Sequence, residues 1–247
     1  MSRLTIASLT PLWINKTYME ADLKIGIGGI LPHVFAGYGG GAKIVLPGVS
    51  SVEGIKYNHN ILSPKARLRI LDGNPLREDM EEAAERVGLN FKIDVVQNSE
   101  HEIVKVFAGQ VKKEHREGVK AFNEIFEVKV PKPVDAVITS ANPKDITFSQ
   151  GTAHTLAAVE PALKRGGTIV VASRAYEGFT FDKDFEEMWK ARLTKEDIEE
   201  RIRSGNIREA NYFYCLADIR KLYTVLVISE GITDDDILQA GFVPAST

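Results

Sequence analysis

Residues 33–43, with the sequence HVFAGYGGGAK, place a lysine at the end of a glycine-rich turn. Four of the nine residues between His33 and Lys43 are glycines, which tolerate positive φ and let a bulky group approach the backbone. Such a loop suits a large polar or phosphorylated ligand held by main-chain N–H groups. A lysine amine in this position can become a nucleophile, because burial favours its uncharged form.

The spacing of this turn matches neither common glycine-rich nucleotide motif. A P-loop ends in Gly-Lys-Ser/Thr, whereas Gly41-Ala42-Lys43-Ile44 lacks both the Gly-Lys pair and the hydroxyl that binds magnesium. The dinucleotide motif opens a helix, whereas the residues after Lys43, Ile44-Val45-Leu46-Pro47, are predicted to be extended. Kinase-like and dehydrogenase-like chemistry are therefore disfavoured. On spacing alone, a structural turn and a ligand site fit the stretch equally well.

A longer run of residues around the turn resembles the nickel-pincer lactate racemase family. The resemblance covers most of the chain with gaps, and it is strongest between residues 21 and 59. The segments that carry it are Gly28-Gly29-Ile30, Pro32-His33, Phe35-Ala36-Gly37, Gly40-Gly41-Ala42-Lys43, Leu46-Pro47-Gly48, Asn58-His59, Gly73-Asn74-Pro75 and the region of Gln150.

The resemblance implies a cofactor attached to Lys43. In that family, a lysine at this position is joined through a thioamide to a pyridinium mononucleotide that also carries a thiocarboxylate. The ring carbon and two sulfurs of this nickel-pincer nucleotide bind nickel, and a histidine matching His59 is the remaining metal ligand. We expect the nucleotide to pack against Gly39, Gly40 and Gly41. Neutral imidazole and soft sulfur are both suitable ligands for square-planar nickel.

Two groups are implied to lie near the substrate. A histidine matching His33 is an acid/base group in the family, and Gln150 matches a glutamine near substrate and cofactor. The family carries a tyrosine just before this glutamine and a lysine three residues after it, whereas this chain has Ser149 and Ala153. These departures remove polar groups that orient a carboxylate. His154 lies one helical turn from Gln150 and faces either the same site or solvent.

For His59 and His33, simpler interpretations stay open. Ser50 or Ser51 is predicted to cap a helix that carries His59. We expect one face of this helix to hold Val52, Ile55, His59 and Leu62. A histidine on such an apolar face can be a core residue satisfied by one hydrogen bond, and His33 at a strand end can be an exposed imidazole.

The implied function is lactate-racemase-like, that is, an isomerase acting on a 2-hydroxy acid. In the family, one histidine takes the hydroxyl proton while hydride moves to the cofactor, and the planar 2-keto acid is then reduced from either face. Two bases flank the substrate, and His33 is the candidate for one of them.

The chain departs from the family in length. Family members are longer and begin with a region that supplies phosphate contacts and a second histidine. His101 and His115 have charged neighbours and are expected to be exposed, so neither replaces that histidine. The chain is thus a fragment, a split subunit that needs a partner, or a degenerate relative. A non-catalytic nucleotide- or metal-binding relative is the alternative function.

Composition narrows the protein class. The net charge is −3, from 31 basic and 34 acidic residues, so no broad basic surface is available for nucleic acid. The single cysteine, Cys215, excludes an internal disulfide and a cysteine-rich metal cage. No apolar run approaches the ~18 residues of a membrane span. The N-terminus lacks a signal-peptide core, and we expect a cytoplasmic protein.

Strands and helices are predicted to alternate, which indicates an α/β fold with largely parallel sheets. We expect two α/β lobes with a cleft between them, divided at Pro131-Lys132-Pro133 into residues 1–130 and 131–247. Strands are predicted at 23–27, 91–97, 103–107, 134–139, 168–172 and 224–228. Helices are predicted at 75–87, 112–126, 149–164, 185–192, 195–204 and 207–221, and Gly166-Gly167 is predicted to separate the third of these from a strand.

Overall fold

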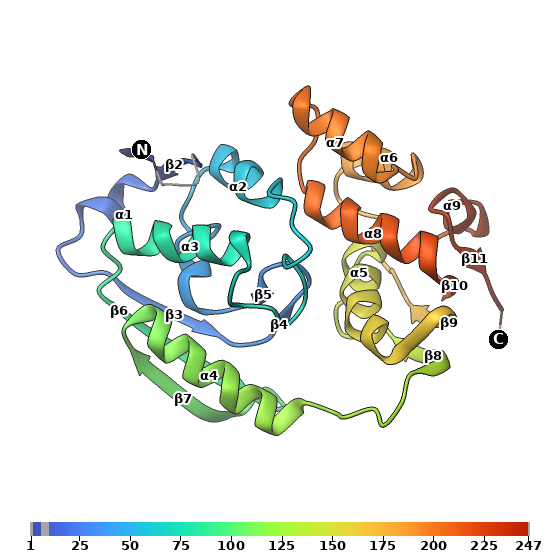
Figure 1. The fold of residues 1–247 in the computed structure, drawn as a ribbon, viewed down its shortest axis with the longest axis horizontal. Helices are drawn as coiled ribbons and strands as arrows, with labels where there is room; N and C mark the ends of the chain where they lie inside the picture. Colours follow the sequence, from blue (N-terminus) through green and yellow to red (C-terminus); the bar gives the residue numbers. More distant parts are fainter. Residues whose placement is uncertain (1, 6–9, 247) are drawn as a thin grey trace. The chain divides into compact units, whose positions relative to one another are not determined.

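A computed structural model describes residues 2–5 and 10–246, in which strands and helices alternate (Figure 1). The chain divides into two compact units. Unit 1 comprises Met1–Val128 and Arg208–Asn211, and unit 2 comprises Lys129–Ile207 and Tyr212–Thr247. The predicted α/β class with largely parallel sheets is confirmed. Among the described residues, no helix has the length and apolar character needed to cross a membrane.

Unit 1 is built around a three-stranded sheet in the order β3-β6-β7, in which β3 runs parallel and β7 antiparallel to β6. Helix α4 packs against β6 and β7 (Figure 1). The elements of this unit are β1 (Ser2–Thr5), β2 (Pro11–Ile14), α1 (Lys16–Glu20), β3 (Ile25–Gly29), β4 (Pro32–His33), β5 (Gly37–Tyr38), the 3-10 helix η1 (Gly41–Ile44), α2 (Val52–His59), α3 (Pro75–Arg86), β6 (Phe91–Gln97), β7 (Ile103–Gly109) and α4 (Val111–Phe126).

Unit 2 contains a four-stranded sheet in the order β11-β10-β9-β8, whose neighbouring strands are all parallel. A cluster of aromatic rings, Phe148, Phe179, Trp189 and Phe242, fills its core. The elements after the first unit are β8 (Val134–Ser140), α5 (Phe148–Val159), η2 (Glu160–Ala162), β9 (Leu163–Ser173), α6 (Lys183–Lys190), α7 (Lys195–Arg203), α8 (Ala210–Leu222), β10 (Thr224–Ser229), α9 (Asp234–Gln239) and β11 (Val243–Pro244).

The helix predicted over residues 149–164 is shorter than expected. It ends at Val159, and Pro161 lies in the 3-10 turn η2, because proline has no N–H with which to continue an α-helix. The chain is extended from Leu163, so Gly166-Gly167 lies inside β9 and does not stop a helix. A Cβ on Gly167 would lie 2.9 Å from the Asp135 carbonyl oxygen, so this glycine permits a close approach of the strands.

Helix α2 begins as predicted but buries a different face. The Ser51 side chain caps it by accepting a hydrogen bond from the Gly54 N–H at 3.3 Å. Val52, predicted to share one helix face with His59, is 70% exposed. The buried face instead holds Gly54, Asn58 and His59, and the Asn58 amide donates to Asp79 at 2.7 Å. Polar contacts therefore fix the helix that carries His59.

Two glycines in β3 make room for a buried ion pair in β6. The register places Gly26 beside Lys92 and Gly28 beside Asp94. Lys92 and Asp94 are fully buried and form an ion pair with each other. A Cβ on Gly28 would lie 2.8 Å from Asp94 Oδ1 and 3.0 Å from Lys92 Nζ. The Ile-Gly-Ile-Gly-Gly sequence of β3 is thus explained by the charges that it faces.

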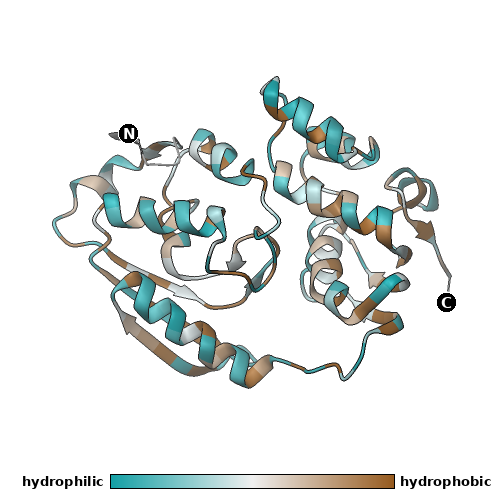
Figure 2. Cartoon of the chain, in the orientation of Figure 1, coloured by the Kyte–Doolittle hydropathy of each residue, from teal (hydrophilic) through white to brown (hydrophobic). Residues whose placement is uncertain are grey.

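The opposite face of this sheet is apolar and exposed. Ile25 pairs with Phe91 across the sheet, and Val95 pairs with Val106. Ile25, Ile27, Phe91 and Val106 are 51%, 68%, 41% and 58% exposed, respectively. Brown, hydrophobic segments mark β3 and β7 in Figure 2. Exposed apolar surface of this kind is typical of interaction sites.

Replacing Gly28 with alanine tests the glycine pairing. Gly28→Ala should lower the free energy of unfolding by ~1–3 kcal/mol, because the added methyl group overpacks the buried ion pair. Gly29→Ala is the matched control in the same strand, since its Cβ would meet its nearest atoms at ordinary distances of 3.8 and 4.0 Å. Urea unfolding followed by circular dichroism measures both variants. An equal loss of unfolding free energy in Gly28→Ala and Gly29→Ala would show that the Lys92–Asp94 pair does not require Gly28.

Candidate cofactor and metal site

The glycine turn before Lys43 adopts a backbone that only glycine accepts easily. Gly37, Gly40 and Gly41 have φ values of 74°, 73° and 58°. A Cβ on Gly40 would lie 2.9 Å from Asp94 Oδ2, and one on Gly41 would lie 2.8 Å from the His115 ring. The positive φ values and the close contacts with Asp94 and His115 therefore both require glycine in this turn.

Several N–H groups of the turn are bonded within the protein. Gly39 donates to the Leu31 carbonyl at 2.6 Å, and Gly41 donates to Asp94 Oδ2 at 2.6 Å. The Lys43 N–H donates to the Gly40 carbonyl at 3.3 Å and belongs to η1. The prediction that residues 44–47 are extended is wrong, because the chain continues into tight turns, with Leu46 N–H bonded to Ala42. The turn thus presents the half-buried Lys43 from a rigid base.

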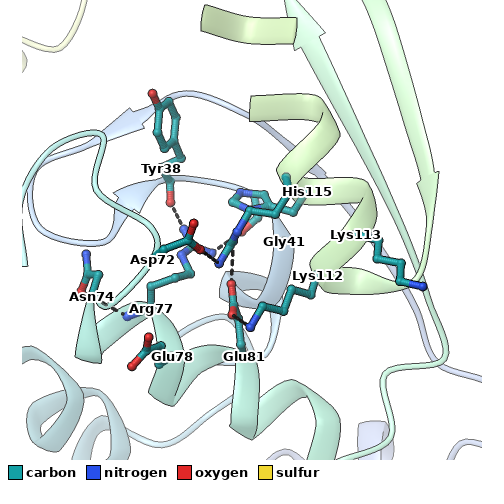
Figure 3. A network of polar contacts seen from close by, with 12 residues as sticks. Tyr38, Gly41, Asp72, Asn74, Arg77, Glu78, Glu81, Lys112, Lys113 and His115 are labelled. Atoms are coloured by element: carbon teal, nitrogen blue, oxygen red, sulfur yellow. Dashed lines mark hydrogen bonds and ion pairs between the residues drawn. The ribbon is translucent and has the colours of Figure 1, made fainter. Parts of the chain in front are cut away.

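Arg77 binds the other side of the turn through its carbonyl groups. This arginine of α3 is fully buried, and its Nε donates to the Ala36 carbonyl at 3.2 Å. Its Nη1 donates to the Gly40 carbonyl at 3.3 Å, and its Nη2 donates to that of Tyr38 (Figure 3). Burial lowers the pKa of Arg77 to about 10, which still leaves the guanidinium charged at neutral pH.

His115 was predicted to be exposed, and this prediction is wrong. Helix α4 buries it against the glycine turn, where only 1% of its surface is exposed. Its Nε2–H donates to the Gly39 carbonyl at 2.8 Å, and its ring lies beside Gly41 (Figure 3). Burial first, and then the charge of Arg77, lowers the pKa of His115 to about 3. His115 is therefore a neutral hydrogen-bond donor at physiological pH.

Glu114 completes a buried polar group under the turn, together with Lys92 and Asp94. Glu114 is 5% exposed. Burial first, and then the negative charge of Asp94, raises its pKa to about 8. A protonated Glu114 carboxyl adds no second negative charge beside Asp94, so the turn is supported by one carboxylate that accepts from Gly41.

His59 presents one bonded and one unbonded ring nitrogen. Its Nδ1 lies 2.7 Å from Glu209 Oε1. Its Nε2 is buried, and no described residue forms a hydrogen bond with it. Because a carboxylate only accepts, Nδ1 is the donor, and a neutral ring then carries a lone pair on Nε2. Such a nitrogen suits a metal ligand, so the structure fits the role that the resemblance implies for His59.

The rings of His33 and His59 both contact the ring of Phe35. The His33 and Phe35 ring centroids are 4.6 Å apart, and those of Phe35 and His59 are 4.8 Å apart. His33 is half-buried in β4, and its Nδ1 accepts the Ala36 N–H at 3.2 Å. The structure thus brings two of the expected site histidines together in unit 1.

The remaining site prediction lies in unit 2. Gln150 is exposed on α5, between the buried Ser149 and the turn that carries Ala153, which is also buried. Its role near the substrate stays a prediction. Within residues 2–5 and 10–246, no group of three or more His, Cys, Asp or Glu side chains is placed to hold a metal ion.

Sequence reasoning missed the residues that support the site. The alternation of charged and apolar residues in β6, facing the glycines of β3, was the available signal for Lys92 and Asp94. Glu209 has no local signal, because it lies 150 residues from His59 in the sequence.

Similarity to known proteins agrees with this geometry. Residues 5–69 match the family described as lactate racemase N-terminal domain. The lactate racemase of Thermoanaerobacterium thermosaccharolyticum is 42% identical over 179 residues, which are 70% of this chain and 42% of that protein. The lactate racemase of Lactiplantibacillus plantarum is 34% identical over 199 residues, which are 79% of this chain and 47% of that protein.

Solved structures share the fold. The structure of the lactate racemase apoprotein from T. thermosaccharolyticum superimposes with a TM-score of 0.89 and 34% identity, over 98% of this chain and 60% of that one. A Thermotoga maritima protein has the same fold, with a TM-score of 0.77 and 16% identity, over 99% of this chain and 68% of that one. The molecule is thus an α/β protein of the architecture found in that apoprotein. It belongs to the lactate racemase family, and the residues that match make up less than half the length of each of the two curated relatives.

The raised pKa of Glu114 predicts a pH-dependent stability difference. Above its ordinary pKa of 4.5, the unfolded chain releases the Glu114 proton while the folded chain keeps it up to about pH 8. Wild type therefore loses stability from this group as the pH rises through that window. Glu114→Gln should gain about 1–3 kcal/mol relative to wild type between pH 5 and pH 8.

Urea unfolding at pH 5 and pH 8 measures this difference. The contribution of His115 to the free energy of unfolding is the same in both proteins, so it cancels in the comparison. Glu124→Gln, an exposed position on the same helix, should show no such pH dependence. A Glu114→Gln difference that is the same at both pH values would mean that Glu114 is ionised in the folded protein.

Proposed function

We propose that this chain is the cofactor-carrying part of a 2-hydroxy acid racemase, with a nickel-pincer nucleotide tethered to Lys43. The observation that carries the proposal is the buried His59 ring, whose Nδ1 is held by Glu209 and whose Nε2 has no hydrogen-bond partner among the described residues. Membership of the lactate racemase family supports it.

Lys43 and His59 are the residues proposed to hold the cofactor. The Lys43 amine forms the attachment, and His59 Nε2 supplies an imidazole ligand to nickel, which accepts nitrogen and sulfur ligands. When bound, the nickel-pincer nucleotide supplies a carbon that takes and returns the substrate hydride. Arg77 and His115 keep the turn rigid, so the lysine is positioned before the cofactor is attached.

His33 is the proposed acid/base group. Its Nδ1 accepts from the Ala36 N–H, so in this conformation the neutral ring carries its proton on Nε2 and can donate a hydrogen bond to a substrate oxygen there. Taking up the hydroxyl proton requires the Ala36 bond to be released, so that one ring nitrogen is free to act as the base. Phe35 contacts the rings of both His33 and His59. Gln150 and the packing of the nucleotide on Gly39, Gly40 and Gly41 are proposed from the resemblance alone.

We also propose that racemisation needs the part of the family's length that lies outside the matched region. The chain matches 42% and 47% of two lactate racemases, and the apolar face formed by Ile25, Ile27, Phe91 and Val106 is exposed. Polypeptide from the rest of the family's length, covalently linked or separate, would cover this face.

A non-catalytic relative is the second candidate function. Ser149 and Ala153 stand where the resemblance expects tyrosine and lysine, and both positions are buried. In that case the protein binds the nucleotide or the metal without turning over a hydroxy acid.

Lys43→Arg tests the attachment. Protein produced together with the enzymes that make the nickel-pincer nucleotide should gain a cofactor-sized mass in wild type but not in Lys43→Arg, because arginine keeps the charge without the amine. Intact-mass spectrometry measures the addition. Lys56→Arg is the control, since Lys56 is also half-buried and close in sequence. An addition on Lys43→Arg, or none on wild type, would contradict tethering at Lys43.

Adding the part of a relative that lies outside the matched region tests this second proposal. The chain alone should not racemise lactate, because losing one acid/base group commonly costs ~10²–10⁴-fold in rate. The part of the T. thermosaccharolyticum enzyme outside the 60% of its chain that superimposes on this one, added as separate polypeptide, should bind the chain and restore hydride exchange. Ile27→Lys should abolish this binding, whereas Ile138→Lys, at an exposed position in unit 2, should not. Racemisation by the isolated chain would overturn the proposal.

A further inference from the structure

The short segment Arg208–Asn211 is fastened to the end of helix α2. It belongs to unit 1, although most of its sequence neighbours belong to unit 2. Besides the contact of Glu209 with His59, the Ala210 N–H donates to Asn60 Oδ1 at 3.0 Å, and the Asn211 amide donates to the Ile61 carbonyl at 2.9 Å. Three consecutive residues therefore bind three consecutive residues at the α2 terminus.

The backbone of this segment directs the Glu209 carboxylate toward His59. Glu209 has a φ of 60°, a left-handed conformation that costs free energy for a residue with a Cβ. Ala210 and Asn211 beside it are buried, with 0% and 1% exposure, which fixes the register. A strained residue held between anchored neighbours is typical of a functional position rather than of a passive link.

The chemistry of the pair determines which ring nitrogen carries the proton. A carboxylate has no donor, so the 2.7 Å contact requires a proton on His59 Nδ1. A second proton on Nε2 would be a buried donor without an acceptor, because that atom has no hydrogen-bond partner among the described residues. A neutral ring held in this way therefore carries its lone pair on Nε2.

We propose that Glu209 is the positioning residue that fixes the Nδ1–H tautomer of His59 and thereby directs Nε2 to nickel. The inference rests on the proposed function of His59 as the metal ligand. Carboxylates that accept the second N–H of a ligating histidine fix its orientation and raise its basicity, and their loss commonly lowers metal affinity about 10–100-fold.

The tautomer can be measured without the cofactor. In protein labelled with ¹⁵N-histidine, long-range proton–nitrogen spectra distinguish the two tautomers, and His59→Ala identifies the His59 signal among the five histidines. Wild type should show the Nδ1–H form, and Glu209→Ala should lose it in favour of Nε2–H. Glu209→Gln, which keeps an acceptor oxygen, should retain part of it. A neutral wild-type ring in the Nε2–H form would overturn the inference.

Asn211→Ala is the matched control for a merely structural role. It removes the neighbouring bond to Ile61 and should lower thermal stability much as Glu209→Ala does, but it leaves the carboxylate in place. The His59 tautomer should stay Nδ1–H in this variant. A change of tautomer in Asn211→Ala as large as that in Glu209→Ala would show that the segment acts only as a tether.

Nickel retention separates this inference from the proposed function. Cofactor-loaded protein is dialysed against a chelator, and nickel per chain is measured. His59→Ala should keep the organic adduct but lose nickel, Glu209→Ala should bind nickel about 10–100-fold more weakly, and Asn211→Ala should match wild type. Full retention in His59→Ala would refute the proposed ligand itself. Loss in His59→Ala together with full retention in Glu209→Ala would refute only the role of Glu209.

Discussion

The buried guanidinium of Arg77 is the constraint on which the candidate site depends. An unpaired buried charge costs several kcal/mol, and here three carbonyl groups of the glycine turn offset that cost. The same contacts fix the direction of those carbonyls, so the turn has little freedom left when it reaches Lys43. The lysine is therefore held by a structure that exists before any ligand binds.

A second layer of buried polar groups makes this arrangement stable. His115 stays neutral because burial and Arg77 oppose its charge, and Glu114 keeps its proton because burial and Asp94 oppose ionisation. Lys92 and Asp94 then form one ion pair instead of a cluster of repelling carboxylates. The protonation of Glu114 and the neutral state of His115 thus limit the number of charges buried beneath the turn.

Local signals in the sequence predicted the elements well and their polar contacts poorly. Strand β6 and the start of helix α2 follow directly from hydrophobic pattern and capping chemistry. The prediction for His115 was wrong because its charged neighbours on α4 indicated an exposed position. His115 itself lies on the face of α4 that is buried in the protein. Residues 44–47 were predicted to be extended, because the apolar Ile44-Val45-Leu46 sequence is compatible with both an extended segment and a turn. The Lys43 and His59 predictions relied on resemblance, and Glu209 required the tertiary structure.

The return of the chain to unit 1 at Arg208–Asn211 has a consequence for synthesis on the ribosome. Residues up to Val128 can form the sheet and helices of unit 1 as soon as they emerge, but the carboxylate that bonds His59 is made 150 residues after that histidine. At roughly 5–20 residues per second, this gap lasts roughly 8–30 s. During that interval the nascent histidine has no Glu209 to hold it. His59 therefore acquires its contact with Glu209 only after the first 209 residues have been translated.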